Sequence, residues 1–435
     1  MKNGAGLPIR GWILLAALFC AASMWIYADR VLIPYQVADA AANGRPRGNL
    51  SDLYPRWLGA RELLLHGRDP YSLEVTRDIQ TGYYGRPLDR TRPGDPKDQQ
   101  GFAYPVYIVF FLAGTISSPF SIVHEFFFWA LLGLTLIGSA VWLRALRWPS
   151  SKAAQITVLV LTLGSLPVMQ GVKLEQMSLL VAGLLAVAVA LLMKDHAVAA
   201  GMVLAFATIK PQLVLLLLLW LGIWTLADFR RRYVCLLSFG VTMAILVGAS
   251  EWFLPHWVSR FLQAARDYQN YTGATGVMEK LAGPLLGRPL ELVTFILLLR
   301  ICWKERLQAA RSSDFMFTVS FVLAGTVLLV PTYAVYNQVL LVPALLWLFK
   351  ERCAIWREGG ASRLVLGMTA GLALWPWLAC SVLAVLSFLL SPRTVERAWA
   401  LPFWTTLLLP VGVAALMLLH SGQRGFAESF EAPTS

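Results

Sequence analysis

The sequence predicts an all-α membrane protein, a polytopic bundle of about twelve transmembrane helices with further external helices beside the membrane. Hydrophobic residues make up 57% of the chain and charged residues only 14%, whereas a soluble domain is about 25% charged. Apolar runs recur from Trp12 to the stretch 403–420. Several runs are shorter than the roughly 20 residues that a perpendicular transmembrane helix needs, which predicts tilted or broken helices.

The net charge of +12 has a simple explanation in a membrane protein. Lys and Arg accumulate on the cytoplasmic loops of such proteins, so this charge does not indicate a nucleic-acid partner. The five cysteines are scattered, lie in or beside apolar runs and show no CxxC spacing. The sequence therefore predicts neither a disulfide framework nor a zinc site.

The distribution of basic residues sets the expected topology of the chain, which we treat as one membrane domain, residues 1–435. The run Trp12 to Tyr27 lacks a clear signal-peptide cleavage site and is expected to be an uncleaved helix with a cytoplasmic N-terminus. Counting the stretch 105–120 as a full span would place most later Lys and Arg outside, against the positive-inside rule. We therefore predict a re-entrant or juxtamembrane hairpin at 105–120 and a cytoplasmic tail at 421–435.

The first external loop, residues 29–104, is the only long polar segment of the chain. Pro55 and a set of apolar residues on one side predict a juxtamembrane helix at about 51–66. Asp52 stands at the front of this helix, and the spacing leaves two roles about equally open. Its carboxylate is either a helix N-cap or a general base that takes the proton of an acceptor hydroxyl.

Two short external turns add polar residues from other parts of the chain. Lys210, which precedes Pro211, either snorkels to the membrane interface or binds a phosphate at headgroup depth. In the turn 170–176, Lys173 and Glu175 are expected to be solvated. Gln176 begins a helix, where its amide can hydrogen-bond a sugar or a phosphate.

The loop 251–282 and the turn 331–338 complete the external set. Aromatic and basic residues at a membrane boundary are mostly interface anchors, and Arg266 is the one that we expect at a donor phosphate. The turn is too polar to face lipid, and Tyr333, Tyr336 and Asn337 are expected to contact a sugar. A Walker motif is absent from the sequence, so ATP-driven transport has no support in this chain.

Several motifs occur in a fixed order along the chain. They are Asp52-x-Tyr54 followed by Ala60-x-x-Leu-Leu-x-x-Gly67-x-x-Pro70-Tyr71, then Phe102-x-Tyr104-Pro105, the helix led by Gln176, Lys210-Pro211, and Pro331 with Pro343. Each motif is weak alone, but their order and spacing over roughly residues 10–350 resemble the bacterial glycosyltransferase family 87. Two departures stand out. Val106 follows Pro105 where many members have a second proline, and Tyr336, Asn337 and Gln338 stand where many have a histidine or an acid.

The resemblance implies a GT-C fold in the bacterial inner membrane, an active site at the external, periplasmic face, and a polyprenyl-phosphate-linked sugar as donor. In the family the acid of the first loop acts as the base of an inverting transfer, and that role maps onto Asp52. Similarity to the mycobacterial phosphatidylinositol-mannoside mannosyltransferase group favours mannose among the hexoses and pentoses. The expected acceptor is a lipid or a glycan.

The resulting hypothesis gives each candidate residue a role. Asp52 is the catalytic base, and fixed positive charge stabilises the leaving phosphate. The predicted phosphate-binding residues are Lys210, Arg56 and Arg266, and the predicted substrate-binding residues are Tyr54, Arg61, Tyr104, Gln176, Tyr333, Tyr336 and Asn337. No Asp-x-Asp pair occurs in the first loop to hold a metal, so we predict transfer without a metal or another cofactor.

The main alternative is a non-enzymatic flippase or transporter of lipids or polysaccharides. Many transporters contain internal repeats with paired broken helices, and the sequence shows no convincing repeat. A third interpretation, an assembly or scaffold protein of the membrane, predicts no polar cavity at all.

Overall fold

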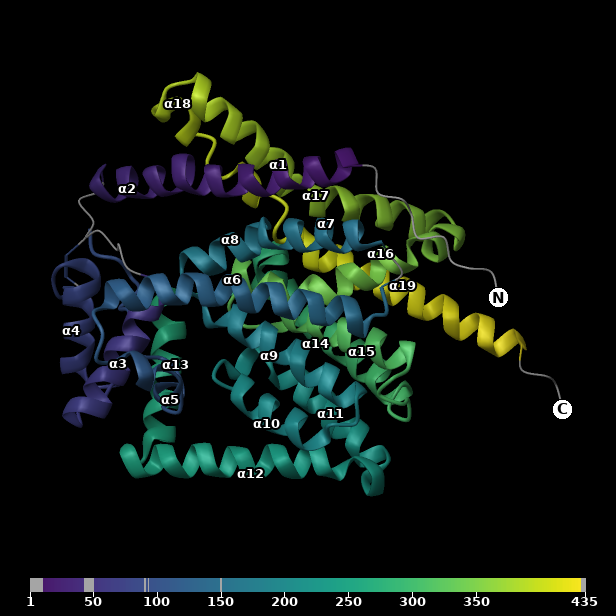
Figure 1. Ribbon diagram of the computed structural model, residues 1–435, viewed down its shortest axis with the longest axis horizontal. Helices are drawn as coiled ribbons and strands as arrows, with labels where there is room; N and C mark the ends of the chain where they lie inside the picture. Colours follow the sequence, from purple (N-terminus) through teal and green to yellow (C-terminus); the bar gives the residue numbers. More distant parts are fainter. Residues whose placement is uncertain (1–10, 43–50, 90, 93, 149–150, 432–435) are drawn as a thin grey trace.

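The computed structural model describes residues 11–42, 51–89, 91–92, 94–148 and 151–431. Throughout these residues the chain forms helices joined by turns, without a β-strand, so the prediction of an all-α protein is confirmed. Most of the long helices run in broadly the same direction along the body of the molecule (Figure 1).

The helices of the first half are α1 (Gly11–Tyr27), α2 (Ile33–Ala42), α3 (Leu53–His66), α4 (Leu73–Tyr84), α5 (Ile108–Leu112), α6 (Phe120–Ala145), α7 (Lys152–Leu163), α8 (Leu166–Lys173), α9 (Met177–Met193), α10 (Ala197–Ala207) and α11 (Leu215–Ala227). Those of the second half are α12 (Phe229–Phe253), α13 (Trp257–Thr272), α14 (Val277–Lys304), α15 (Ser313–Leu329), α16 (Val342–Arg357), α17 (Gly360–Leu389), α18 (Pro392–Glu396) and α19 (Leu408–Glu431). Short turns of other helix types are η1 (Ala28–Leu32), η2 (Ala113–Thr115), η3 (Pro211–Leu213), η4 (Val335–Leu341) and η5 (Leu401–Phe403).

Helices of membrane-spanning length are fewer than the sequence predicts. Among the described residues, five helices are long and apolar enough to cross a membrane, or six if α7 and α8, which are bent by 50°, form one span. Four further apolar helices, α9, α10, α11 and α15, are shorter. The expected membrane character is supported, whereas the count of about twelve spans is not confirmed.

The first helix extends beyond the apolar run from Trp12 to Tyr27. The π-helical turn η1 joins α1 to α2, and together they form a span of 32 residues from Gly11 to Ala42. Met24 and Val31 are fully buried in a cluster with residues of α8 and α17. Apolar packing therefore continues past the first charged residues of the segment, which the hydropathy pattern did not predict.

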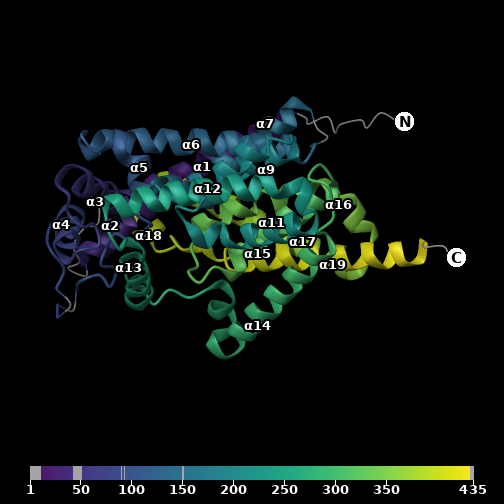
Figure 2. The same ribbon diagram turned by 90° about the horizontal axis from the view of Figure 1, so that it is seen from below.

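The two ends of the helical body carry different parts of the chain. In both views α3, α4 and α13 lie towards one end, whereas the end of α19 lies at the opposite end (Figure 1; Figure 2). Helices α3 and α4 thus form a layer over one end of the bundle, joined there by α13 from much later in the sequence. Which end faces the cytoplasm stays a prediction.

Helix α3 is the central element of this layer, and it matches the helix predicted at about 51–66. Trp57 and Ala60 are buried, and Gly59 allows Phe102 to pack so closely that a Cβ there would lie 2.4 Å from its ring. Gly67, with φ of 64°, ends the helix in the left-handed conformation that glycine adopts without steric cost. The same segment therefore buries one helix face and leaves its N-terminal end beside the membrane bundle.

The stretch 105–120 contains only the short helices α5 and η2 before α6 begins at Phe120. Ile108 and Leu112 of α5 are fully buried in the main core. The re-entrant or juxtamembrane placement of the stretch 105–120 stays a prediction. The predicted tail 421–435 continues α19 to Glu431, and its last four residues lie outside the described part of the chain.

Candidate active site

Asp52 lies at the start of α3 but does not cap it. The hydroxyl of Ser51 instead accepts the Leu53 N–H at 3.2 Å, and the Asp52 side chain forms no capping hydrogen bond. The Asp52 backbone N–H donates to the Leu174 carbonyl at 3.0 Å, which fixes the start of α3 to the turn between α8 and α9. Asp52 thus occupies the N-cap position without capping the helix through its side chain, and its carboxylate is directed to other partners.

The amide of Gln176 connects Asp52 to Lys210. Gln176 Nε2 donates to Asp52 Oδ2, and Lys210 Nζ donates to Gln176 Oε1 at 3.0 Å. A carboxylate can only accept and an ammonium can only donate, so these two partners fix the orientation of the amide between them. Gln176 is the residue before α9 and makes no capping contact of its own, which leaves its side chain free for this role.

Lys210 is held at this position by the proline that follows it. Pro211 disfavours a helical conformation in the preceding residue, and Lys210 accordingly leaves the helical region, with φ of −127° and ψ of 76°. Its ammonium donates to Ser178 Oγ at 2.7 Å and lies 4.8 Å from the ring centroid of Tyr336. Only 6% of Lys210 is exposed, so the side chain does not snorkel to a water-facing surface.

The turn η4 closes the network from the late part of the chain. Ser178 Oγ donates to Asn337 Oδ1 at 2.8 Å, and Asn337 is buried. The same hydroxyl accepts from Lys210, so each of its hydrogen bonds has a chemically consistent direction. The turn η4 therefore contributes the Tyr336 ring next to the Lys210 ammonium group and, through Ser178, the amide of Asn337.

Arg56 stands one helical turn after Asp52 and adds a second buried cation. Its Nη1 donates to the Asp52 backbone carbonyl, and its guanidinium lies 4.6 Å from the ring centroid of Tyr104. The Nε atom is buried and has no hydrogen-bond partner among the described residues. An unpaired buried donor is costly, and an anionic ligand would satisfy it.

The surroundings of Asp52 favour proton uptake. Burial, the largest influence, raises the pKa of the Asp52 carboxyl above its ordinary value. The charges of Arg56 and Lys210 and the hydrogen bond from Gln176 oppose this rise. A carboxylate with a raised pKa is a stronger base, in its ionised form, than a solvated one, which suits a general base.

A second connection between the same two segments was not predicted. Glu175 is 1% exposed, and its two carboxylate oxygens contact Ser51 Oγ and, at 2.9 Å, His124 Nδ1. Burial raises the pKa of Glu175, and these two partners oppose the rise. The expectation that Glu175 is solvated is wrong, because Ser51 and His124 come from distant segments and cover it.

Four of the predicted site residues lie outside this network. Tyr54 packs against Phe120, with ring centroids 4.9 Å apart, and Arg61 lies 5.5 Å from the Trp57 ring, on the side of α3 within the loop layer. The hydroxyl of Tyr333 donates to Thr406. Arg266 is exposed on α13, and no hydrogen bond or ion pair joins it to another described residue. The structure thus brings together Asp52, Arg56, Tyr104, Gln176, Lys210, Tyr336 and Asn337.

Sequence reasoning missed three residues of this region. Ser178 carries no motif signal, because a serine inside an apolar helix is common. Burial and then the charge of Asp98 raise the pKa of Tyr268 to about 12, with smaller effects of Arg56 and Asp52. The hydroxyl of Tyr268 and the carboxyl of Asp98 therefore lie within electrostatic reach of the site. Tyr268 was visible in the sequence only as one of several interface aromatics.

One known protein family matches this chain. The model of glycosyltransferase family 87 matches residues 102–332, more than half of the chain. No curated protein and no solved structure matches the chain. The matched segment contains Tyr104, Gln176 and Lys210. It ends before Tyr336 and Asn337. Asp52 and Arg56 precede it and contact Gln176 and Tyr104 within it. On the strength of this match, the chain belongs to glycosyltransferase family 87.

Proposed function

We propose that the protein transfers a sugar from a polyprenyl-phosphate-linked donor to an acceptor hydroxyl, with Asp52 as general base. Membership of a glycosyltransferase family supports the reaction class. The observation that carries the proposal is the hydrogen-bonded chain from Lys210 through Gln176 to Asp52. A base and a cation at opposite ends of one hydrogen-bonded network support a displacement at an anomeric carbon.

In the proposed step the Asp52 carboxylate takes the proton of the acceptor hydroxyl. The acceptor oxygen forms a bond to the anomeric carbon as the bond from that carbon to the phosphate oxygen breaks. The polyprenyl phosphate leaves with the electron pair of the broken bond, and the configuration at the anomeric carbon is inverted. Asp52 then loses the proton to solvent or to the released phosphate before the next turnover.

Positive charge at the leaving group is the second requirement. Lys210 has three N–H donors, of which Gln176 and Ser178 occupy two. The third donor of Lys210 and the guanidinium charge of Arg56, whose buried Nε has no hydrogen-bond partner among the described residues, would stabilise the phosphate. Buried, fixed donors stabilise developing negative charge more than solvated ones do, because they need no reorganisation during the step.

The finer assignments rest on the family resemblance. We propose mannose as the favoured sugar, a lipid or glycan acceptor, and a bacterial inner membrane location with the site at the periplasmic face and both termini in the cytoplasm. The cationic side chains would make a metal unnecessary for a donor with a single phosphate, so full activity is expected in EDTA.

Transfer assays on purified protein in lipid nanodiscs test the proposal. The donors would be polyprenyl-phosphate-linked mannose, glucose and arabinose, and a membrane lipid extract would supply acceptors. We expect one donor to give a glycosylated product with the wild type and almost none with Asp52→Asn. Translocation of lipid by reconstituted vesicles without any sugar transfer would instead establish the transporter alternative.

A further inference from the structure

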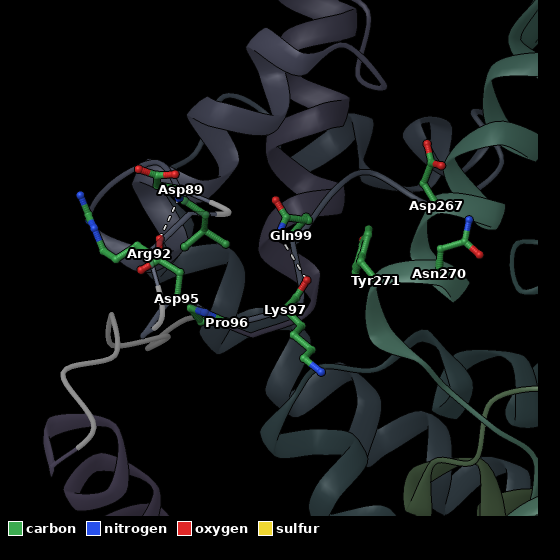
Figure 3. A pocket seen from close by; sticks show the side chains of 10 residues that line it. Asp89, Arg92, Asp95, Pro96, Lys97, Gln99, Asp267, Asn270 and Tyr271 are labelled. Carbon is green, nitrogen blue, oxygen red and sulfur yellow. Dashed lines mark hydrogen bonds between the residues drawn. The ribbon is translucent and has the colours of Figure 1, made fainter.

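A polar cavity lies at the same end of the molecule as the candidate active site. It has a volume of about 640 Å³ and opens between the loop 88–99 and helix α13. Asp267, Asn270 and Tyr271 of α13 lie across it from Asp89, Arg92 and Asp95 (Figure 3). This volume is within the usual range of small-molecule sites.

The charges that line the cavity nearly cancel. Its carboxylates are those of Asp89, Asp95 and Asp267, and its cations are Arg92 and Lys97. Asp95 is already paired with Arg86, which lies outside the lining, at 2.9 Å. The lining therefore has no excess of either sign that would select a phosphate or a polycation, and it suits a neutral polar ligand.

The side chains on the α13 wall are suited to hydroxyl groups. Asp267 and Asn270 are three residues apart, so they project from one face of the helix. Both are exposed, and neither has a side-chain hydrogen bond within the described part of the chain. Together a carboxylate and an amide can accept from and donate to neighbouring hydroxyls, and the Tyr271 ring adds an apolar face next to them.

Two segments connect this cavity to the candidate active site. On α13, Asn270 and Tyr271 line the cavity, whereas Tyr268 lies within electrostatic reach of Arg56 and Asp52. In the loop, Lys97 and Gln99 line the cavity, whereas Asp98 between them lies close enough for Asp52 and Arg56 to influence its ionisation. The same two segments thus line the cavity and carry residues within electrostatic reach of the site.

From this juxtaposition we propose that the cavity between loop 88–99 and α13 binds a saccharide portion of the acceptor. The inference rests on the proposed glycosyl transfer and specifies that the acceptor is a glycan or a glycolipid headgroup. The outer sugars of the acceptor would occupy the cavity, and the hydroxyl that reacts would lie towards Asp52. A membrane-bound donor and a hydrophilic acceptor would then approach from different sides.

The probes for this proposal are di- to tetrasaccharides of mannose, glucose and arabinose, offered to nanodisc-embedded protein in the absence of sugar detergents. Binding is measured by saturation-transfer NMR without donor, and transfer is measured with each polyprenyl-phosphate sugar. The test variant is the double substitution Asp267→Ala with Asn270→Ala. The matched control is Gln269→Ala, an exposed amide on the same helix outside the cavity lining.

We expect the wild type and Gln269→Ala to bind at least one oligosaccharide and to glycosylate it. The double variant should raise the acceptor KM at least tenfold while the donor KM and kcat stay unchanged. If its melting temperature falls, Arg92→Ala on the opposite wall replaces it with the same expectation. Binding of an oligosaccharide by the wild type without transfer from any donor would support the cavity but overturn the proposed function.

Two results would overturn the cavity proposal while leaving the proposed function intact. One is transfer to lipid alcohols with no oligosaccharide bound by the wild type. The other is an acceptor KM that changes less than twofold both in the double variant and in Arg92→Ala.

Discussion

Asp52 and Glu175 are acidic residues on two segments that face each other, and each forms a hydrogen bond across to the other segment. Glu175 contacts Ser51 and His124, one at each carboxylate oxygen, and is almost completely buried. Asp52 accepts one side-chain hydrogen bond, from Gln176, and remains partly exposed beside two cations. Asp52 therefore retains acceptor capacity for a substrate proton, whereas Glu175 is covered by Ser51 and His124 and is only 1% exposed.

Burial alone does not distinguish the base from the other acid, Glu175. Burial raises the pKa of both carboxyl groups. Glu175 is held by a serine and a histidine and serves to position the start of α3. Asp52 is linked to a buried lysine, and only this acid has both a cation network and an open side. The predictions below test that division of roles.

Replacement of Lys210 by Met should have the largest effect among the residues that support Asp52. The variant removes the charge that polarises the Gln176 amide and that would bind the leaving phosphate. Loss of one such fixed donor typically lowers kcat by about 10²–10³-fold. Lys173→Met, which removes another cation of the same end, should lower kcat far less. Equal losses in both variants would contradict a specific role for Lys210.

The pH dependence of kcat should reveal the base. Because burial raises the pKa of Asp52, the acid limb of the profile should lie above the ordinary aspartate value of about 3.9. Below that raised pKa the carboxyl is protonated and cannot accept the substrate proton, so activity falls as the pH is lowered. The limb should persist in Glu175→Gln. Its disappearance in that variant would assign the titration to Glu175.

Glu175→Gln should affect stability more than chemistry. The substitution leaves one of the two partners, Ser51 or His124, without its carboxylate acceptor, and an unpaired buried polar group costs about 1–3 kcal/mol. We expect a lower melting temperature and less than a tenfold loss of kcat, because Asp52 remains in place through Gln176. An inactive variant with an unchanged melting temperature would make Glu175 the base.

Arg266→Ala should have the smallest effect. The sequence suggested Arg266 as a ligand of the donor phosphate, but it is exposed on α13 and makes no contact with the Lys210 network. Surface substitutions of this kind usually change stability by less than about 0.5 kcal/mol. The donor KM should stay within experimental error of the wild type. A tenfold rise in that KM would restore Arg266 to the phosphate site.

Local signals in the sequence were sufficient for several elements. Pro55 and Gly67 mark the first turn and the end of α3, and Pro211 forces Lys210 out of the helix that precedes it. These features depend on the backbone preferences of a few adjacent residues, so they can be predicted without tertiary information.

Features that depend on distant segments could not be predicted. Gln176 and Asp52 are 124 residues apart, and so are Ser51 and Glu175. Neither the link between the first two nor the burial of Glu175 follows from local spacing. The continuation of the first helix past Tyr27 likewise involves distant segments, because Val31 and Leu32 of η1 pack against residues of α8 and α17. The Lys210 turn was predictable as an element, but its partners were not.

The most direct measurement of the central claim is the single-turnover rate of Asp52→Asn with donor and acceptor both saturating. The asparagine keeps an oxygen that can accept from Gln176, so the fold and donor binding should be retained. If Asp52 is the base, donor affinity should stay unchanged while the rate of transfer falls by about 10²–10⁴-fold, the usual contribution of a general base. A rate equal to that of the wild type would contradict the role of Asp52 as the base.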